Sequence, residues 1–257
     1  MITFELLQLF FQRKWRWLII TAIIVGIYLL MIGTGVQEQN LWGGLVFVFS
    51  QQFICMVVMP SLFICLIVDL IVDDIGNGLI GYTLPRSKSR ISWLLAKVIS
   101  LFASAFIFTS ICLLVYLALS LMMGLPMEKG WVSILFNIPI APITVVITIM
   151  INYILTLTAF GMFILMLSIL TRNAILSWAI GAIISIMGYV SWMYLAFRPF
   201  NQWFPTAQMM FLSQIPNKIT EDLFTVQWSI SYNIVLFITS FFISFYRIRK
   251  MNLSRKD

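Results

Sequence analysis

The sequence is poor in charged residues and contains no histidine. Charged residues make up only 10% of its 257 residues, whereas a soluble globular domain usually has about 25%. Hydrophobic residues make up 61%, and the mean hydropathy is +1.02. So little charge cannot cover a water-exposed surface. The composition therefore excludes an ordinary soluble domain and predicts an integral membrane protein.

The missing residues also exclude several kinds of enzyme. Without histidine there is neither an HExxH metalloprotease motif nor a His-containing zinc site. Cys55, Cys65 and Cys112 form no CxxC pair and lie in apolar runs, as small buried hydrophobes do. No GxSxG motif occurs, and Asp69 is the only carboxylate within an apolar run. We therefore predict neither enzyme activity nor a metal site.

The chain also lacks any Gly-Lys dipeptide, and so lacks the GxxxxGK[ST] loop that cradles the phosphates of ATP. Any ATP used by this protein must be bound and hydrolysed by a partner. We expect no cofactor in this chain itself.

Long apolar runs dominate what is present. A helix needs about 20 apolar residues to cross a bilayer, and six runs approach or exceed that length: 17–35, 46–72, 93–123, 138–170, 175–197 and 230–246. Pro60 is expected to bend the second run. The predicted fold is all-α, with six transmembrane helices in one domain, 1–257.

The basic residues predict the orientation. Lys and Arg are retained on the cytoplasmic side of membrane proteins, and counting across the six runs places 13 of the 16 on one side. Both termini lie on that side, which predicts a multi-pass protein with cytoplasmic termini. Because the net charge of +7 is concentrated beside the apolar runs, we expect contact with the lipid bilayer and no nucleic-acid binding.

The N-terminal segment 1–16 is amphipathic. Glu5, Gln8 and Gln12 share one helical stripe, and phenylalanines and leucines cover the rest. This pattern predicts a helix lying in the membrane interface. A signal peptide is the alternative, but here the basic residues follow an apolar segment instead of preceding it.

A few polar residues lie within the apolar runs. Gln51, Gln52 and Asn152 are candidates for lining a translocation path, because lipid exposure of such side chains is costly. The alternatives are an interfacial position for the glutamines and a hydrogen bond to a neighbouring helix for Asn152. Lys97 is a weaker candidate, since a lysine near the end of a span can extend to the membrane surface.

Ser177, Gly181 and Ser185 repeat at four-residue spacing in the fifth run. Small residues at this spacing allow two helices to approach closely. The stripe predicts either packing within the chain or an interface with a second subunit.

The segment 198–225 is predicted to be external and partly embedded in the membrane. Prolines divide it into pieces too short to span, which favours a re-entrant or interfacial helix. Met209, Met210 and Phe211 are candidates for an adaptable surface that contacts amphipathic cargo. The alternative is that they only seal the bundle against lipid.

The cytoplasmic loop 73–90 is unusually apolar. Asp74 and its acidic neighbour suit the N-terminus of a short helix, and Pro85 would end it before a basic stretch. Leu79, Tyr82 and Leu84 indicate a surface covered by a cytosolic partner. The alternative is a loop anchored in the membrane interface.

This loop resembles that of the permease subunits of type-2 ATP-binding-cassette exporters. The residues that match the family pattern in order are Asp74, Gly76, Leu79, Tyr82, Leu84, Pro85, Arg86 and Ser87, and Lys97 corresponds to a lysine that begins the next helix. The order of helices along the whole chain, including the short turn at 167–174, also fits this family.

The resemblance implies that loop 73–90 contains a coupling helix seated on a cytosolic nucleotide-binding ATPase subunit, which binds ATP and Mg. It also implies a second permease, in a homodimer or heterodimer contacted by the first and fifth spans. The short chain looks most like permeases of the bacterial cell membrane that export peptide toxins or antimicrobial peptides. Export of drugs or lipids, and a non-transporting membrane anchor or regulator, are the alternatives.

Overall fold

The computed structural model describes residues 13–33, 41–49, 51–67, 90–125, 142–194, 198–210 and 225–250. Throughout these ranges the regular structure is helical, without a strand, which confirms the predicted all-α class. The elements are α2 (Arg13–Gly33), α3 (Leu41–Val48), η1 (Ile54–Val58), α4 (Met59–Ile67), α7 (Arg90–Met122), α9 (Pro142–Thr171), α10 (Ala174–Met193), α11 (Arg198–Asn201), η4 (Thr206–Met209) and α13 (Val226–Lys250).

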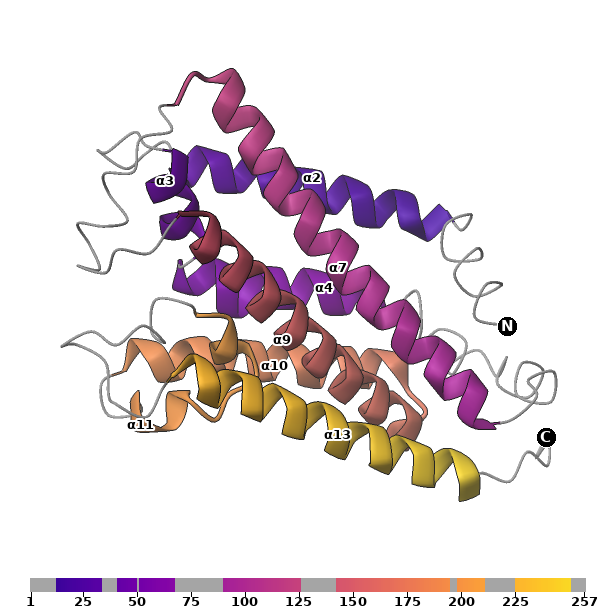
Figure 1. Cartoon of the computed structure of the whole chain (residues 1–257). Helices are drawn as coiled ribbons and strands as arrows, with labels where there is room; N and C mark the ends of the chain where they lie inside the picture. Colours follow the sequence, from indigo (N-terminus) through magenta and orange to yellow (C-terminus); the bar gives the residue numbers. More distant parts are fainter. Residues whose placement is uncertain are drawn as a thin grey trace.

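Four segments of the described chain are long and apolar enough to cross a membrane: Arg90–Met122, Val146–Thr171, Ile175–Met193 and Val226–Lys250. These helices support the predicted membrane protein. The longest, α7, has 33 residues and at 1.5 Å per residue exceeds the ~30 Å hydrocarbon layer. It runs obliquely across the bundle in Figure 1, as a helix longer than the bilayer is thick is expected to do.

The helices run alternately between two ends of the bundle. Figure 1 shows the first turns of α2, α7 and α10 toward the right-hand end, together with the last turns of α4, α9 and α13. We call this the basic end, because Arg90, Arg172 and the last turn of α13 lie there. The opposite end carries α3, α11 and η4, and we call it the junction end.

Helix α9 is the centre of the bundle. In its most apolar window 72% of residues are buried, against 22–44% in the other three long helices. It packs against α13, α7, α10 and α4, and Tyr153 and Phe160 are fully enclosed. The outer faces of α2, α7, α10 and α13 instead carry exposed apolar side chains, which suits contact with lipid.

The second predicted span is interrupted. In place of one helix over 46–72, α3 ends at Val48 and a π-helical turn at Ile54–Val58 leads directly into α4. Pro60, near the start of α4, has no N–H to donate to the preceding turn, so a regular α-helix cannot continue through it. The irregular turn lies immediately before this proline, where the sequence predicted a bend.

Other boundaries differ by a few residues. Helix α7 already begins at Arg90, within the loop predicted at 73–90, and α2 begins at Arg13, within the predicted interfacial helix 1–16. Residues 1–12 of that helix lie outside the described residues. Helix α13 extends past the predicted run 230–246 at both ends. At its C-terminal end the added residues include Arg247, Arg249 and Lys250, and arginine and lysine are good helix formers that prolong a helix beyond its apolar part.

Candidate functional site

Asn152 joins three segments at the junction end. Its side-chain Nδ2 donates to the Gln208 carbonyl at 2.6 Å, and its Oδ1 accepts from the Ser229 hydroxyl at 3.1 Å. The same hydroxyl lies 3.3 Å from the Gln208 carbonyl. All three residues are buried. Asn152 thus ties the middle of the chain to η4 and α13, and we call this arrangement the polar junction.

The short segment 198–210 is held by further bonds around this junction. The Gln208 side-chain Nε2 donates to the Gln202 backbone carbonyl at 2.6 Å, and the Trp228 indole N–H donates to the same carbonyl at 3.2 Å. The Tyr232 hydroxyl donates to the Trp203 carbonyl at 2.7 Å. The segment is therefore attached to α13 through the backbone carbonyls of Gln202 and Trp203, and the Trp203 ring also packs edge-on against Trp228.

Helix α10 closes the other side of the segment. The Ser191 hydroxyl contacts both the Gly188 carbonyl, at 2.6 Å, and the Asn201 Oδ1, at 3.1 Å. A Cβ at Gly188 would lie 2.7 Å from the Thr206 Oγ1, so only glycine allows this approach. The segment is wedged between α10 and α13.

Met209 and Met210, proposed from the sequence as a cargo surface, are buried at 0% and 2% exposure. They lie at the end of η4, which packs against α9, α10 and η1. Phe211 lies outside the described residues. In this conformation the two methionines fill the interior, which favours the sealing role that was the alternative.

Gln51 and Gln52 are half-buried at the start of the interrupted span. The Gln51 carbonyl accepts from the Cys55 N–H at 2.9 Å, which starts the helical turn. The adjoining turn η1 packs against η4. The glutamines therefore precede an element in contact with the junction, but no hydrogen bond among the described residues joins them to Asn152.

The stripe of Ser177, Gly181 and Ser185 faces the interior of the chain. Both serines are fully buried, and each donates to a carbonyl four residues earlier in sequence. A Cβ at Gly181 would lie 2.6 Å from the Ile164 Cδ1 and 3.1 Å from the Ile64 Cδ1. These contacts favour packing within the chain over an interface with a second subunit.

The proposed coupling residues Asp74, Gly76, Leu79, Tyr82, Leu84, Pro85 and Arg86 lie outside the described residues. The described residues on either side of them end at Ile67 and resume at Arg90. The Arg90 guanidinium donates to the carbonyls of Ile248 and Arg249 at 2.9 and 2.7 Å. Lys97, one turn further along α7 from Trp93, is buried at 3% exposure, with its Nζ 5.8 Å from the centre of the Trp93 ring.

Sequence reasoning missed most partners of Asn152. Gln208 and Ser229 are distant in sequence, and a second pair, Asn233 and Thr156, is joined by a 2.9 Å bond. One signal was present: Ser229, Asn233, Ser240 and Ser244 are all buried on one face of α13. A polar stripe on a membrane helix predicts a helix partner.

A third buried contact was also missed. The Cys55 thiol and the Tyr153 hydroxyl lie 2.7 Å apart, and each is 2.9 Å from the Phe49 carbonyl. Tyr153 thereby donates a hydrogen bond to the Phe49 carbonyl, which lies just after the end of α3. A lone tyrosine in an apolar run carries no signal for such a partner.

The polar junction consists of the Asn152 amide, the Ser229 hydroxyl and the Gln208 carbonyl. These groups donate and accept hydrogen bonds and do not ionise at neutral pH. Within the described ranges no three His, Cys, Asp or Glu residues come close enough to hold a metal ion. The junction can fix or release a segment, or orient a polar ligand, without taking part in covalent chemistry.

The family described as protein of unknown function (DUF2705) has a model that matches residues 6–254, so the chain belongs to this family. No curated protein and no solved structure matches the chain.

Proposed function

We propose that this DUF2705 member is the permease subunit of an ATP-driven exporter in a bacterial cell membrane. It crosses the membrane six times, with both termini in the cytoplasm, and forms half of a translocation path. It has no catalytic residue, and a cytosolic nucleotide-binding subunit binds ATP and Mg. The observation that carries the proposal is that the two helices on either side of the matching loop, α4 and α7, have the ends nearest to it at the basic end.

Six spans are consistent with the helices described. Four are long enough alone. Helix α2 has 21 residues with the apolar stretch Ile19–Tyr28, and the interrupted run of α3, η1 and α4 contains the stretch Ile54–Ile67. The alternation of helix ends in Figure 1 gives each of these two runs the direction that a first and second span need.

A second permease is proposed to bind the face formed by α2, α4 and α10. Helix α4 contacts both α2 and α10, and apolar residues such as Ile24 on α2 and Ile183 on α10 are exposed at 59% and 56%. The family resemblance implies contacts through the first and fifth spans, which correspond to α2 and α10. The partner is a second copy of this chain or a related permease.

The substrate is proposed to be an amphipathic peptide, a toxin or an antimicrobial peptide. Export of drugs or lipids by the same build is the second candidate, because the apolar surfaces suit any amphiphile. Met209 and Met210 fill the interior, so serine at these two positions is expected to lower protein abundance and export together. The cargo-contacting role is therefore tested at Phe211, where Phe211→Ser is expected to lower peptide export more than it lowers protein abundance or basal ATPase activity. A loss of export matched by a loss of folded protein would contradict a cargo-contacting role.

Coupling is tested by copurification with the nucleotide-binding subunit. The double variant Tyr82→Asp and Leu84→Asp places two charges in the proposed contact, and should lower the retained ATPase by at least about tenfold. Ser89→Asp is the matched control, because it adds an acidic residue to the same loop outside the matching residues. If the double variant retains as much ATPase as the control and transports normally, the chain is not a permease coupled through this loop. A membrane anchor or regulator would then be the better description.

A further inference from the structure

The described residues carry charge of one sign only. Every charged residue within those ranges is a lysine or an arginine, and none is a carboxylate. At the basic end Arg172, Arg247, Arg249 and Lys250 are all exposed. Like charges gathered at one level repel each other unless an anion lies among them. A ligand of this end is therefore expected to be anionic.

The register of two helices brings these charges together. Helices α9 and α13 run in the same direction in Figure 1, and the bonds Asn152 to Ser229 and Thr156 to Asn233 both join residues 77 positions apart. If the offset of 77 residues is kept to the C-terminal ends of α9 and α13, Arg172 is level with Arg249. By this register the backbones of the two arginines lie at the same level, one just after α9 and the other in the last turn of α13.

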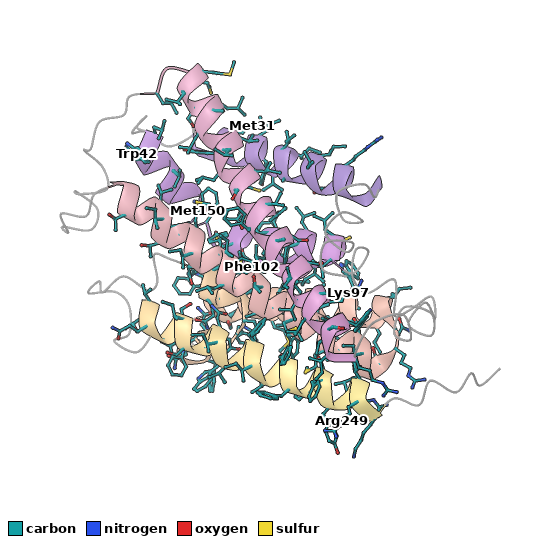
Figure 2. All side chains as sticks on the ribbon, turned by 45° about the vertical axis from the view of Figure 1, so that its right-hand side comes forward. Met31, Trp42, Lys97, Phe102, Met150 and Arg249 are labelled. Atoms are coloured by element: carbon teal, nitrogen blue, oxygen red, sulfur yellow. The ribbon has the colours of Figure 1, made fainter. Side chains whose placement is uncertain are left out.

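Arg90 fixes the end of α13 at that level. Its guanidinium donates to the carbonyls of Ile248 and Arg249, two of the carbonyls that a helix leaves without intrahelical partners at its C-terminus. The first residue of α7 thereby holds the last turn of α13. Figure 2 shows Arg249 at the end of α13, beyond the packed side chains of the bundle. Its side chain extends from a backbone that is already in place.

Arg172 occupies a backbone conformation that suits glycine better. Its φ is +55°, and it is the only non-glycine residue with positive φ in the described part of the chain. For a side chain with a Cβ this region costs about 1 kcal/mol or more. The next residue, Asn173, caps α10 by accepting from the Leu176 N–H at 3.1 Å. Because glycine would avoid this cost, an arginine at the turn is in keeping with a binding role for its charged side chain.

The basic residues lie where the apolar surface ends. Leu170 on α9 and Phe242 and Ile243 on α13 are exposed at 40%, 63% and 44%. Tyr246, one turn further, is exposed, and its hydroxyl accepts from the Lys250 ammonium. Tyrosine and lysine at the end of an apolar helix mark the headgroup region of a bilayer. A lipid whose headgroup is bound there would have its acyl chains along the exposed apolar residues of α13, such as Phe242.

We propose that Arg172, Arg247, Arg249 and Lys250, positioned by Arg90, form a binding surface for the phosphate of an anionic membrane lipid. Arginine provides paired N–H donors that match phosphate oxygens, and the exposed apolar side chains next to them accept the acyl chains. An acidic protein would use the charges but leave this apolar margin uncovered. The inference requires that the basic end lies at the bilayer surface, and it does not depend on coupling to an ATPase.

The test measures lipid retention by the purified full-length chain. The protein is exchanged into detergent with equal amounts of phosphatidylglycerol and phosphatidylcholine, and the bound lipids are counted by native mass spectrometry. Arg172→Gln with Arg249→Gln should lower retention of phosphatidylglycerol by about fivefold for each arginine, with phosphatidylcholine unchanged. Arg172→Lys with Arg249→Lys keeps the charge and should restore most of the preference. Arg16→Gln, an exposed arginine on α2, is the control for net charge.

Three results would overturn the proposal. One is an unchanged phosphatidylglycerol preference in the glutamine double variant with a wild-type elution profile and melting temperature. Another is an equal loss in Arg16→Gln, which would assign the effect to net charge. The third is an unchanged lipid preference with loss of a copurifying protein, which would assign the cluster to an acidic partner. If the double variant does not fold, Arg249→Gln alone, on an exposed side chain, is measured in the same way. None of these readouts involves ATP, so failure of the exporter proposal leaves them interpretable.

Discussion

The two ends of the bundle are held together by different chemistry. At the junction end, neutral groups bond to one another through Asn152, Ser229 and the Gln208 carbonyl, and these groups are buried. At the basic end, Arg90 secures the last turn of α13, and Arg172, Arg247, Arg249 and Lys250 are exposed. One end is closed by the chain itself, whereas the other presents charge to its surroundings. The difference supports the proposal that partners from outside the chain bind at the basic end.

The strongest test of this comparison is to remove the central amide of the junction. Asn152→Leu eliminates the bonds to Gln208 and Ser229 and leaves a buried carbonyl and hydroxyl with poorer partners. We expect a loss of about 2–3 kcal/mol in the free energy of unfolding, measured by unfolding in mixed detergent micelles.

The control for this change is Thr148→Val, one turn earlier on the same helix, whose hydroxyl donates to the Thr144 carbonyl within α9 at 2.8 Å. Hydrogen exchange should increase in residues 198–210 and stay unchanged in the first turns of α7. Equal stability of the two variants would show that the junction does not hold this end closed.

A smaller effect is expected where α10 packs on the centre of the bundle. Gly181→Leu must displace the ends of Ile164 and Ile64, which are flexible enough to yield in part. We expect a loss of about 1–2 kcal/mol in the free energy of unfolding, because the interior has to accommodate four added carbons.

Ile183→Leu, on the exposed side of the same helix, should have no measurable effect on unfolding. Crosslinking of the same samples distinguishes the two interpretations of the stripe. A stable Gly181→Leu protein with a reduced yield of crosslinked dimer would favour the subunit interface over intrachain packing.

The smallest effect is expected at the basic end. Arg90→Gln removes the two bonds to the last carbonyls of α13, which are near the surface and can bond to water instead. We expect a loss of about 0.5–1 kcal/mol in the free energy of unfolding, with faster hydrogen exchange in residues 245–250. Arg247→Gln, which is exposed, is the control. A loss as large as that of Asn152→Leu would mean that this end too is held closed from within.

The sequence predicted the helices better than their contacts. The start of α7 lies three residues before the predicted Trp93, and the long apolar helices were recognised because burial in lipid requires a continuous run of apolar residues. The break before α4 followed only in part from Pro60, since the choice of a π-helical turn depends on what packs around it. The polar junction could not be read from the chain, because the pairing of Asn152 with Ser229 depends on the register of two helices.

The coupling loop remains a prediction, since Tyr82 and Leu84 lie outside the described residues. The role of Ser177, Gly181 and Ser185 is a different case. Their spacing predicted a close helix approach without identifying the partner, because small residues look the same whether the partner belongs to the same chain or to another. The packing of Ile164 and Ile64 around Gly181 supplies the information that the spacing lacked.

The pairing of α9 with α13 has a consequence for the synthesis of the protein. Thr156 and Asn233 are 77 residues apart, which corresponds to roughly 4–15 s of translation at about 5–20 residues per second. During that interval Asn152 and Thr156 have been synthesised while their partners on α13 have not. Until α13 is inserted, the polar side chains of α9 therefore lack these hydrogen-bond partners and must contact the insertion machinery or earlier helices instead.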